Sequence, residues 1–511
     1  MNFRILSFTL FAPLAGALLT MVIPREDVRT IRRVGTAFAF LTLVLTTVVW
    51  IGVIQIGPGE IQYAERHPWI PAFNVQYSIG VDGLSAPMLF LTALLTTLSL
   101  FYSAHAIEAR VKEYYFLFLL LETGLFGSFL ALDLVLFYVF CEVGLVPMFL
   151  ITGVWGGERR EHAAIKFFLY TLIGSVLMLL AIIGVYLQTG TFDVMEAAEI
   201  GPFSSPEQWQ VACIVFWALL IAFAIKIASF PFHTWLPDVH TEAPTAGSVM
   251  LAGIVLKLGA YGLIRVALPL FPQPFHHFTV QVPVIPVVAV VSIVYGALVC
   301  MAQWDLKRLA AYSSVPDMGY VLLGVCATAA GLPQLSTSEA LNAAAAGLNG
   351  AAMQMFAHGI VTGGLFFLVG ILHQRTRTYD LKTFGGLAAQ TPYIYGFTIM
   401  AGFAALGLPG LAGFWGKFLT FRGTARFIPT AAFVGVLGLV FTAGGILWKL
   451  IQQVFLGRLD KRKWGRLKDM TWWEKATMWP LVLATVLLGL YPTPVLSSFN
   501  AALTTLLQEL P

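Results

Sequence analysis

The chain has 511 residues, of which 58% are hydrophobic and only 11% are charged. Soluble domains carry roughly 25% charged residues, so this composition excludes a water-soluble globular protein. The formal net charge of +4 is small and belongs to the loops, so it does not indicate nucleic-acid binding. Apolar runs long enough to cross a hydrocarbon layer of about 30 Å recur from end to end.

Hydropathy predicts an all-α integral membrane protein with about fourteen transmembrane helices. The N-terminal run from Arg4 to Ile23 also has the outline of a signal peptide, but it is too long and lacks a small-residue cleavage site before Arg25. We therefore interpret it as the first membrane helix. The expected spans are residues 5–23, 34–56, 82–104, 114–132, 133–153, 163–187, 211–230, 244–268, 283–303, 308–330, 341–372, 391–421, 430–455 and 477–503.

Two of these spans contain helix-breaking sequences. The sequence SFPF at residues 229–232 ends the seventh span within apolar sequence, and GLPG at residues 407–410 interrupts the twelfth. Proline removes a backbone donor and clashes with the preceding turn, which a membrane tolerates only where the freed groups face protein or water. Because the breaks lie five spans apart, their helices run in opposite directions, which suggests an inverted repeat of five helices each.

Loop charge and the number of spans predict a common side for both termini, and the matched breaks suggest four parts of the chain. Nearly all loop Lys and Arg residues fall on the side reached after the first helix, here called the inner side. With an even number of spans, both termini lie on the outer side. The expected parts are helices 1–3 (1–113), the first repeat with helices 4–8 (114–270), the second repeat with helices 9–13 (271–457), and a basic inner loop with helix 14 (458–511).

Several ionisable residues fall inside the expected spans. A Lys or Asp at the centre of a membrane helix costs roughly 2.5–3.5 kcal/mol on insertion, and such residues usually mark ion paths or relays. The alternative is snorkelling or structural pairing, which we favour for Lys449, one turn from an inner loop, and leave open for Arg265. The residues concerned are Glu122, Glu142, Lys226, Lys257, Arg265, Asp317, His358, Lys417 and Lys449.

Three of these residues have strongly apolar surroundings. Glu142 lies mid-way along its span, Lys226 precedes the first break by about one turn, and Lys257 has small and apolar neighbours. Burial disfavours the charged form of both carboxylates and lysines, so such groups can change protonation when a partner charge approaches or leaves. Glu142 and Lys226 are therefore candidates for a switching ion pair.

The remaining candidates lie beside or beyond the breaks. His358 stands among glycine and alanine, where a histidine can carry a proton or be a hydrogen-bonded core residue. Lys417 follows the second break, and Asp317 is a secondary candidate inside the tenth span. His233 and His240 flank the first break on the inner side. No cysteine or carboxylate spacing supports a metal site there, so proton entry is the favoured interpretation.

Cofactor motifs are missing from the sequence. The four cysteines lie far apart inside apolar runs, which indicates neither disulfides nor a metal site. The GxGxxG, P-loop and HExxH patterns are also absent. We therefore expect no metal, nucleotide, flavin or iron–sulfur site in this chain, and no nucleic-acid partner.

One long motif resembles a known family. The stretch FHTWLPDVHTEAPTAGSV at residues 232–249, between Lys226 and Lys257, is similar to the antiporter-like subunits of respiratory complex I, and most similar to subunit M (subunit 4). Supporting motifs are GVDGLS at 80–85, KFFLYT at 166–171 and DLKRLAAYSS at 305–314. The resemblance implies a fourteen-helix inverted-repeat fold in a bacterial inner membrane. It also implies a proton channel in which Glu142, Lys226, Lys257 and His358 match the family's functional positions.

The sequence departs from the subunit M pattern at three positions. Ala228 stands where the family usually has proline, Asp317 where it usually has histidine, and Lys417 where it usually has glutamate. The resemblance implies neighbouring antiporter-like subunits as partners, with FMN, iron–sulfur clusters and quinone in other subunits. A multisubunit Na⁺/H⁺ antiporter and a membrane scaffold are the competing functions. The lysines disfavour Na⁺ because sodium sites prefer oxygen ligands.

Overall fold

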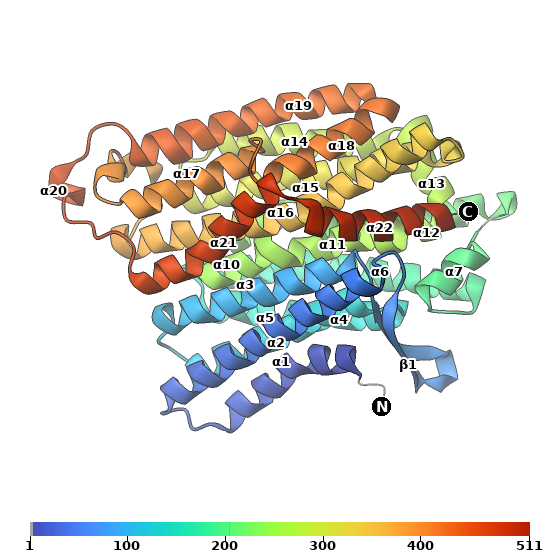
Figure 1. Cartoon of the computed structure of the whole chain (residues 1–511), viewed down its shortest axis with the longest axis horizontal. Coiled ribbons are helices and arrows are strands. Elements are labelled where there is room, and N and C mark those ends of the chain that lie inside the picture. The colour runs from blue at the N-terminus through green and yellow to red at the C-terminus, as the bar shows by residue number, and fades with distance from the viewer. Residues whose placement is uncertain (1–3, 204, 511) are drawn as a thin grey trace.

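A computed structural model of the chain describes residues 4–203 and 205–510. The chain forms an elongated bundle of helices that run side by side, with α1 at one flank and α19 at the other (Figure 1). The helices of the first half are α1 (Ile5–Val22), α2 (Val28–Ile56), α3 (Ser85–Ala106), α4 (Val111–Leu130), α5 (Leu134–Trp155), α6 (Arg160–Thr189), α7 (Val194–Ile200), α8 (Trp209–Lys226), α9 (Trp235–Glu242), α10 (Thr245–Met250), α11 (Leu256–Gly262) and α12 (Leu268–Leu270).

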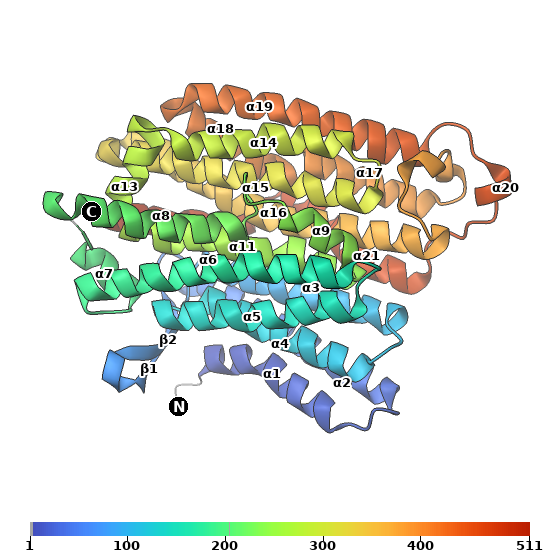
Figure 2. The same cartoon turned by 180° about the vertical axis from the view of Figure 1, so that it is seen from behind.

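The second half continues the same bundle, seen from behind in Figure 2. Its helices are α13 (Pro272–His276), α14 (Val284–Ala302), α15 (Leu306–Gly331), α16 (Ser338–Thr376), α17 (Pro392–Leu406), α18 (Gly413–Phe427), α19 (Pro429–Gly444), α20 (Lys461–Trp464), α21 (Trp472–Leu490) and α22 (Thr493–Glu509). The π-helical segments are η3 (Leu251–Val255), η4 (Leu263–Ala267), η5 (His277–Gln281) and η9 (Gly445–Gln453). The short 3-10 turns are η1 (Pro71–Phe73), η2 (Pro206–Gln208), η6 (Leu332–Gln334), η7 (Leu381–Thr383) and η8 (Leu387–Ala389).

The all-α membrane architecture expected from hydropathy is confirmed, with one addition. Within the described residues, 12 helices are long and apolar enough to cross a membrane, or 13 if the bent pair α21 and α22 counts as one span. The expected span 391–421 is instead two helices of 15 residues each, α17 and α18. Length and composition therefore do not establish the expected count of fourteen, and the inverted repeat stays a prediction.

A small β-hairpin between α2 and α3 was not expected. Strands β1 (Gln62–Ile70) and β2 (Val75–Val81) pair antiparallel. The start of α1 and the end of α22 lie at the end of the bundle opposite α20 (Figure 1). The common side expected for the termini thus agrees with the arrangement of the helices.

Helix α16 occupies the middle of the bundle. All of its most apolar 18-residue window is buried, whereas the corresponding share is 28% in α2 and 39% in α6. A helix that is enclosed on all sides meets neighbours from both halves of the chain. Side chains of α16 can therefore join residues of the first half to residues of the second.

Both expected breaks are present, although the first helix ends earlier than predicted. Helix α8 stops at Lys226, and Ala228 adopts a left-handed backbone with φ +52°. At the second break, helix α17 stops at Leu406 and is followed by Gly407 at φ +79°. Glycine adopts this conformation without a steric penalty, whereas alanine is strained by it. The second break therefore uses its glycine, and the first break carries backbone strain at Ala228.

Backbone groups that the breaks set free find partners inside the protein. The Trp235 indole donates to the Ile225 carbonyl at 3.1 Å, and the Phe230 backbone NH donates to Ser292 Oγ at 2.9 Å. At the second break, the Ala412 NH donates to the Thr485 carbonyl at 2.9 Å. This pairing is what a non-helical backbone at membrane depth requires.

Candidate functional site

Four buried titratable side chains come from four different helical elements. Lys257 lies on α11 between the π-helical segments η3 and η4, and His358 lies near the middle of α16. Asp317 follows Pro316 within α15, and Lys417 follows the second break on α18. Their exposed fractions lie between 0% and 5%. The helices therefore bring together residues that are up to 160 positions apart in the chain.

These side chains form a continuous series of contacts. Lys257 Nζ lies 2.6 Å from His358 Nδ1 and also donates to the Ala252 carbonyl. His358 Nε2 lies 3.8 Å from Asp317 Oδ2. Asp317 Oδ1 lies 3.0 Å from Lys417 Nζ, which also donates to the Ala405 carbonyl freed at the second break. We call Lys257, His358, Asp317 and Lys417 the central chain.

The contact between Lys257 and His358 assigns the ring proton. When Lys257 is protonated, its ammonium can only donate, so His358 Nδ1 is the acceptor and a neutral ring carries its hydrogen on Nε2. That nitrogen faces Asp317 across 3.8 Å, which is longer than a hydrogen bond. A proton can cross this gap after a small movement or through a bridging water.

Two residues that the sequence analysis missed support the central chain. Gln354, one turn before His358 on α16, donates through Nε2 to Asp317 Oδ1 at 3.0 Å. The Tyr320 ring lies under Lys417 Nζ at 5.4 Å, and its hydroxyl donates to the Gly435 carbonyl at 3.1 Å. Both are neutral side chains, so the search for ionisable residues in apolar spans could not find them. Only the spacing of Gln354 to His358 on one helix face was a usable signal.

Glu142 and Lys226 lie in a separate cluster in the first half. Glu142 on α5 is half-buried and accepts a hydrogen bond from Ser175 Oγ of α6. Lys226, 7% exposed, lines a small cavity together with Cys141, Thr171 and Trp235. Within the described residues no ion pair joins Glu142 to Lys226. The two members of the expected switching pair are thus not joined by an ion pair in this structure.

The secondary candidates lie outside the central chain. Arg265 on η4 forms an ion pair with Asp82, whose carboxylate also accepts the backbone NH of Ser85 at the start of α3. This contact favours the structural interpretation of Arg265. His233 stacks on Phe230 at 5.9 Å beside the first break.

Two further ionisable residues have structural partners. Glu122 on α4 is fully buried, and its Oε1 lies 2.7 Å from Thr42 Oγ1 of α2. Lys449 on η9 lies with Nζ 2.9 Å from the centre of the Trp304 ring. A cation over an aromatic face is a structural contact, in line with the interpretation favoured for Lys449.

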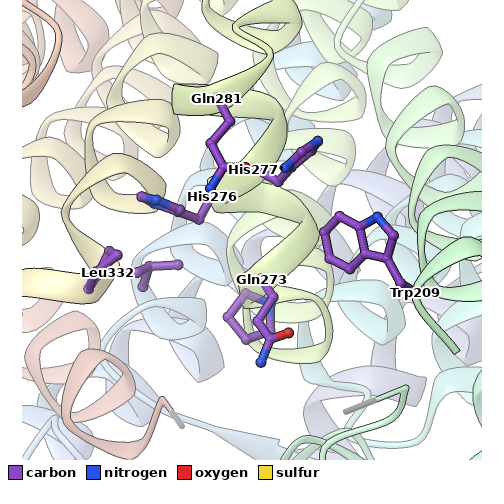
Figure 3. A pocket seen from close by; sticks show the side chains of 8 residues that line it. Trp209, Gln273, His276, His277, Gln281 and Leu332 are labelled. Carbon is purple, nitrogen blue, oxygen red and sulfur yellow. Dashed lines mark hydrogen bonds between the residues drawn. The ribbon is translucent and has the colours of Figure 1, made fainter. Parts of the chain in front are cut away.

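A surface hollow lies elsewhere, at the end of the bundle opposite α20. Trp209, Gln273, His276, His277 and Gln281 line it (Figure 3). His276 turns toward α15 and bonds the Ala329 carbonyl at 2.9 Å, whereas His277 turns the other way, toward Trp209. The two rings do not converge on one point. Among residues 4–203 and 205–510, no group of three or more His, Cys, Asp or Glu residues could hold a metal ion.

A membrane-embedded bundle with two broken helices and a central chain of Lys, His and Asp defines a class of proteins that carry ions across the bilayer. The comparisons with known proteins are more specific. Residues 131–442 match the family model described as NADH:quinone oxidoreductase/Mrp antiporter, TM. The chain belongs to this family.

Individual relatives point to one branch of the family. The chain is 40% identical to NADH-quinone oxidoreductase subunit M of Rhodobacter capsulatus, over 99% of this chain and 97% of that one. It is 38% identical to the same subunit of Rickettsia bellii (strain RML369-C), over 98% of both chains. A chain of respiratory complex I from Thermus thermophilus has 31% identity and a TM-score of 0.86, over 99% of this chain and 100% of that one. The resemblance to subunit M inferred from the motifs is confirmed.

Proposed function

We propose that this chain is a proton-translocating, antiporter-like subunit of an NADH–quinone oxidoreductase. The observation that carries the proposal is the central chain, in which Lys257, His358, Asp317 and Lys417 follow one another at distances of 2.6, 3.8 and 3.0 Å. Each of these groups has a protonated and a deprotonated form, so a proton can pass along the series. The high identity to subunit M supports the assignment to this complex.

The geometry suggests an order of events. Lys417, beside the break between α17 and α18, first releases a proton toward the outer side and becomes a neutral amine. His358 then gives its Nε2 proton to the Asp317 carboxylate while its Nδ1 accepts a proton from the Lys257 ammonium, and Asp317 passes its proton to the Lys417 amine. Uptake of a proton by the Lys257 amine from the inner side, and return of the His358 ring hydrogen from Nδ1 to Nε2, reset the series. Glu142 and Lys226, in their separate cluster, would control access by approaching and separating.

The chain needs an external source of energy. We expect FMN, iron–sulfur clusters and quinone to reside in partner subunits, and this chain to lie beside other antiporter-like subunits in a bacterial inner membrane. Its termini would face the outer, periplasmic side. A Na⁺/H⁺ antiporter subunit is the second candidate, but no observation favours it, because a path with two lysines suits protons better than sodium ions.

Proton uptake by inverted membrane vesicles tests the proposal. Lys257→Met in the assembled complex should lower the number of protons taken up per NADH oxidised to the level supplied by partner subunits. Lys449→Met is the matched control, because Lys449 is also buried but contacts Trp304 away from the central chain. Unchanged proton uptake with Lys257→Met, in a complex of normal abundance, would rule out the proposed path.

A further inference from the structure

Two loops at the α20 end of the bundle carry an unusual excess of basic residues. Residues 378–391 and 456–471 together contain seven Lys and Arg residues and three Asp residues, a net charge of +4. All seven basic side chains are exposed. We call them the basic rim: Lys382, Arg458, Lys461, Arg462, Lys463, Arg466 and Lys468.

The three aspartates of these loops do not neutralise the basic rim. Asp380 and Asp460 accept backbone NH groups at the starts of η7 and α20, and Asp469 accepts those of Tyr393 and Ile394 at the start of α17. Within the described residues, no member of the rim forms an ion pair. Elsewhere at this end, by contrast, Arg159 pairs with Glu242 and Lys166 with Asp238.

Hydrogen bonds fix the two loops that carry the basic rim to each other. Trp464 of α20 is buried, and its indole donates to the Thr383 carbonyl at 2.9 Å. The Gly386 NH donates to the Leu456 carbonyl at 2.9 Å, which ties the two loops together. Helix α20 projects beyond the ends of the other helices in both views (Figures 1 and 2). The cations of α20 are therefore carried by an anchored loop at the outermost point of this end.

Exposed aromatic residues surround the rim at the ends of the membrane helices. Trp304, Trp448, Tyr393 and Trp472 expose 40%, 47%, 47% and 73% of their surface. Tryptophan and tyrosine concentrate at the depth of lipid headgroups, and clusters of Lys and Arg beside a membrane helix attract anionic lipids. The flanking helices are lipid-facing by composition, since α19 exposes Phe433 and α21 exposes Leu487.

We propose that the basic rim binds the headgroups of anionic phospholipids. The combination of cations that form no ion pair with exposed aromatic rings favours a lipid over an acidic protein surface, because such rings concentrate at the depth of lipid headgroups. This proposal is independent of the proton path. It concerns the seven surface residues of the basic rim, six of which lie in the loop that carries α20.

Photo-crosslinking of lipids to the assembled complex in nanodiscs tests the proposal. The probes are phosphatidylglycerol and phosphatidylcholine with the same acyl chains and a diazirine near the headgroup, and labelled peptides are mapped by mass spectrometry. Phosphatidylglycerol should label residues 456–475 at least ~tenfold more than phosphatidylcholine. The triple variant Lys461→Gln/Arg462→Gln/Lys463→Gln should remove this preference.

A matched triple variant distinguishes lipid binding by the basic rim from attraction by the general positive charge at this end of the bundle. Arg29, Arg33 and Arg160 are also exposed and form no ion pair within the described residues, so replacing all three with Gln should leave the labelling unchanged. An excess of soluble glycerophosphoglycerol should not compete, because it lacks acyl chains. Four results would each overturn the proposal. They are equal labelling by both lipids, equal loss of labelling in both triple variants, full competition by the soluble headgroup, and an acidic subunit that covers the rim.

Discussion

At the scale of single residues, Asp317 links the two ends of the central chain. Its Oδ1 accepts hydrogen bonds from Gln354 and Lys417, and its Oδ2 faces His358. A buried carboxylate is stable only with such partners. Two of the three departures from the subunit M pattern, Asp317 and Lys417, thus contact each other. Because their charges are opposite, the two buried side chains stabilise each other.

Removing one partner of this pair should be more damaging to stability than removing both. Asp317→Asn leaves Lys417 buried without its counter-charge, which typically costs about 3–5 kcal/mol. We expect a low abundance of the assembled complex and no proton uptake through this subunit. The double variant Asp317→Asn/Lys417→Met should restore abundance but not proton uptake. Immunoblots of membranes and vesicle assays check both effects, and a double variant that pumps normally would contradict the role of the pair.

Glu122 should behave differently from Glu142. The Thr42 hydroxyl lies 2.7 Å from both the Ala39 carbonyl and Glu122 Oε1, although it has a single hydrogen. A neutral Glu122 that donates to Thr42 Oγ1 satisfies both contacts. Glu122→Gln should therefore keep normal abundance and proton uptake, whereas Glu142→Gln should lose uptake. Severe loss of uptake with Glu122→Gln, at normal abundance, would show that Glu122 carries protons.

At the scale of elements, both breaks and all four members of the central chain could be predicted from the sequence. Proline, glycine and charged residues are costly inside apolar spans, so each stands out by itself. Their contacts could not be predicted, because they depend on how helices rotate against one another. The separation of Glu142 from Lys226 could therefore not be predicted, and the π-helical segments beside Lys257 and the β-hairpin had no clear sequence signal.

The contact of α16 with α18 depends on Gly416. A Cβ at this position would lie 2.6–2.7 Å from atoms of Gln354, two of them in the backbone. Gly416→Ala should push α18 away from α16 and separate Lys417 from Asp317, so both abundance and proton uptake should fall. Gly396→Ala on α17 is the control, since a Cβ there meets nothing within 4 Å. We expect the control to be neutral or slightly stabilising, by up to about 1 kcal/mol. A thermal-stability assay on the purified complex compares the two, and equal behaviour would refute the packing argument.

At the scale of the whole molecule, the titratable residues form two groups, one in the first half of the chain and one that crosses the centre of the bundle. Glu142 and Lys226 lie in the first half, and the central chain runs from Lys257 in the first half to Lys417 in the second. His358 on the enclosed helix α16 connects the halves. Under the proposed function, a charge moved near Lys226 would change the electric field along the central chain and so couple this subunit to its partners.

The central claim is that Lys257 and Lys417 belong to one proton path. A double-variant comparison tests it most directly, by measuring protons taken up per NADH oxidised in vesicles with Lys257→Met, Lys417→Met and both. If the path is single, each variant removes the whole contribution of this subunit, so all three should show the same residual uptake from partner subunits. A double variant with clearly lower uptake than either single variant would show that the two lysines serve separate routes.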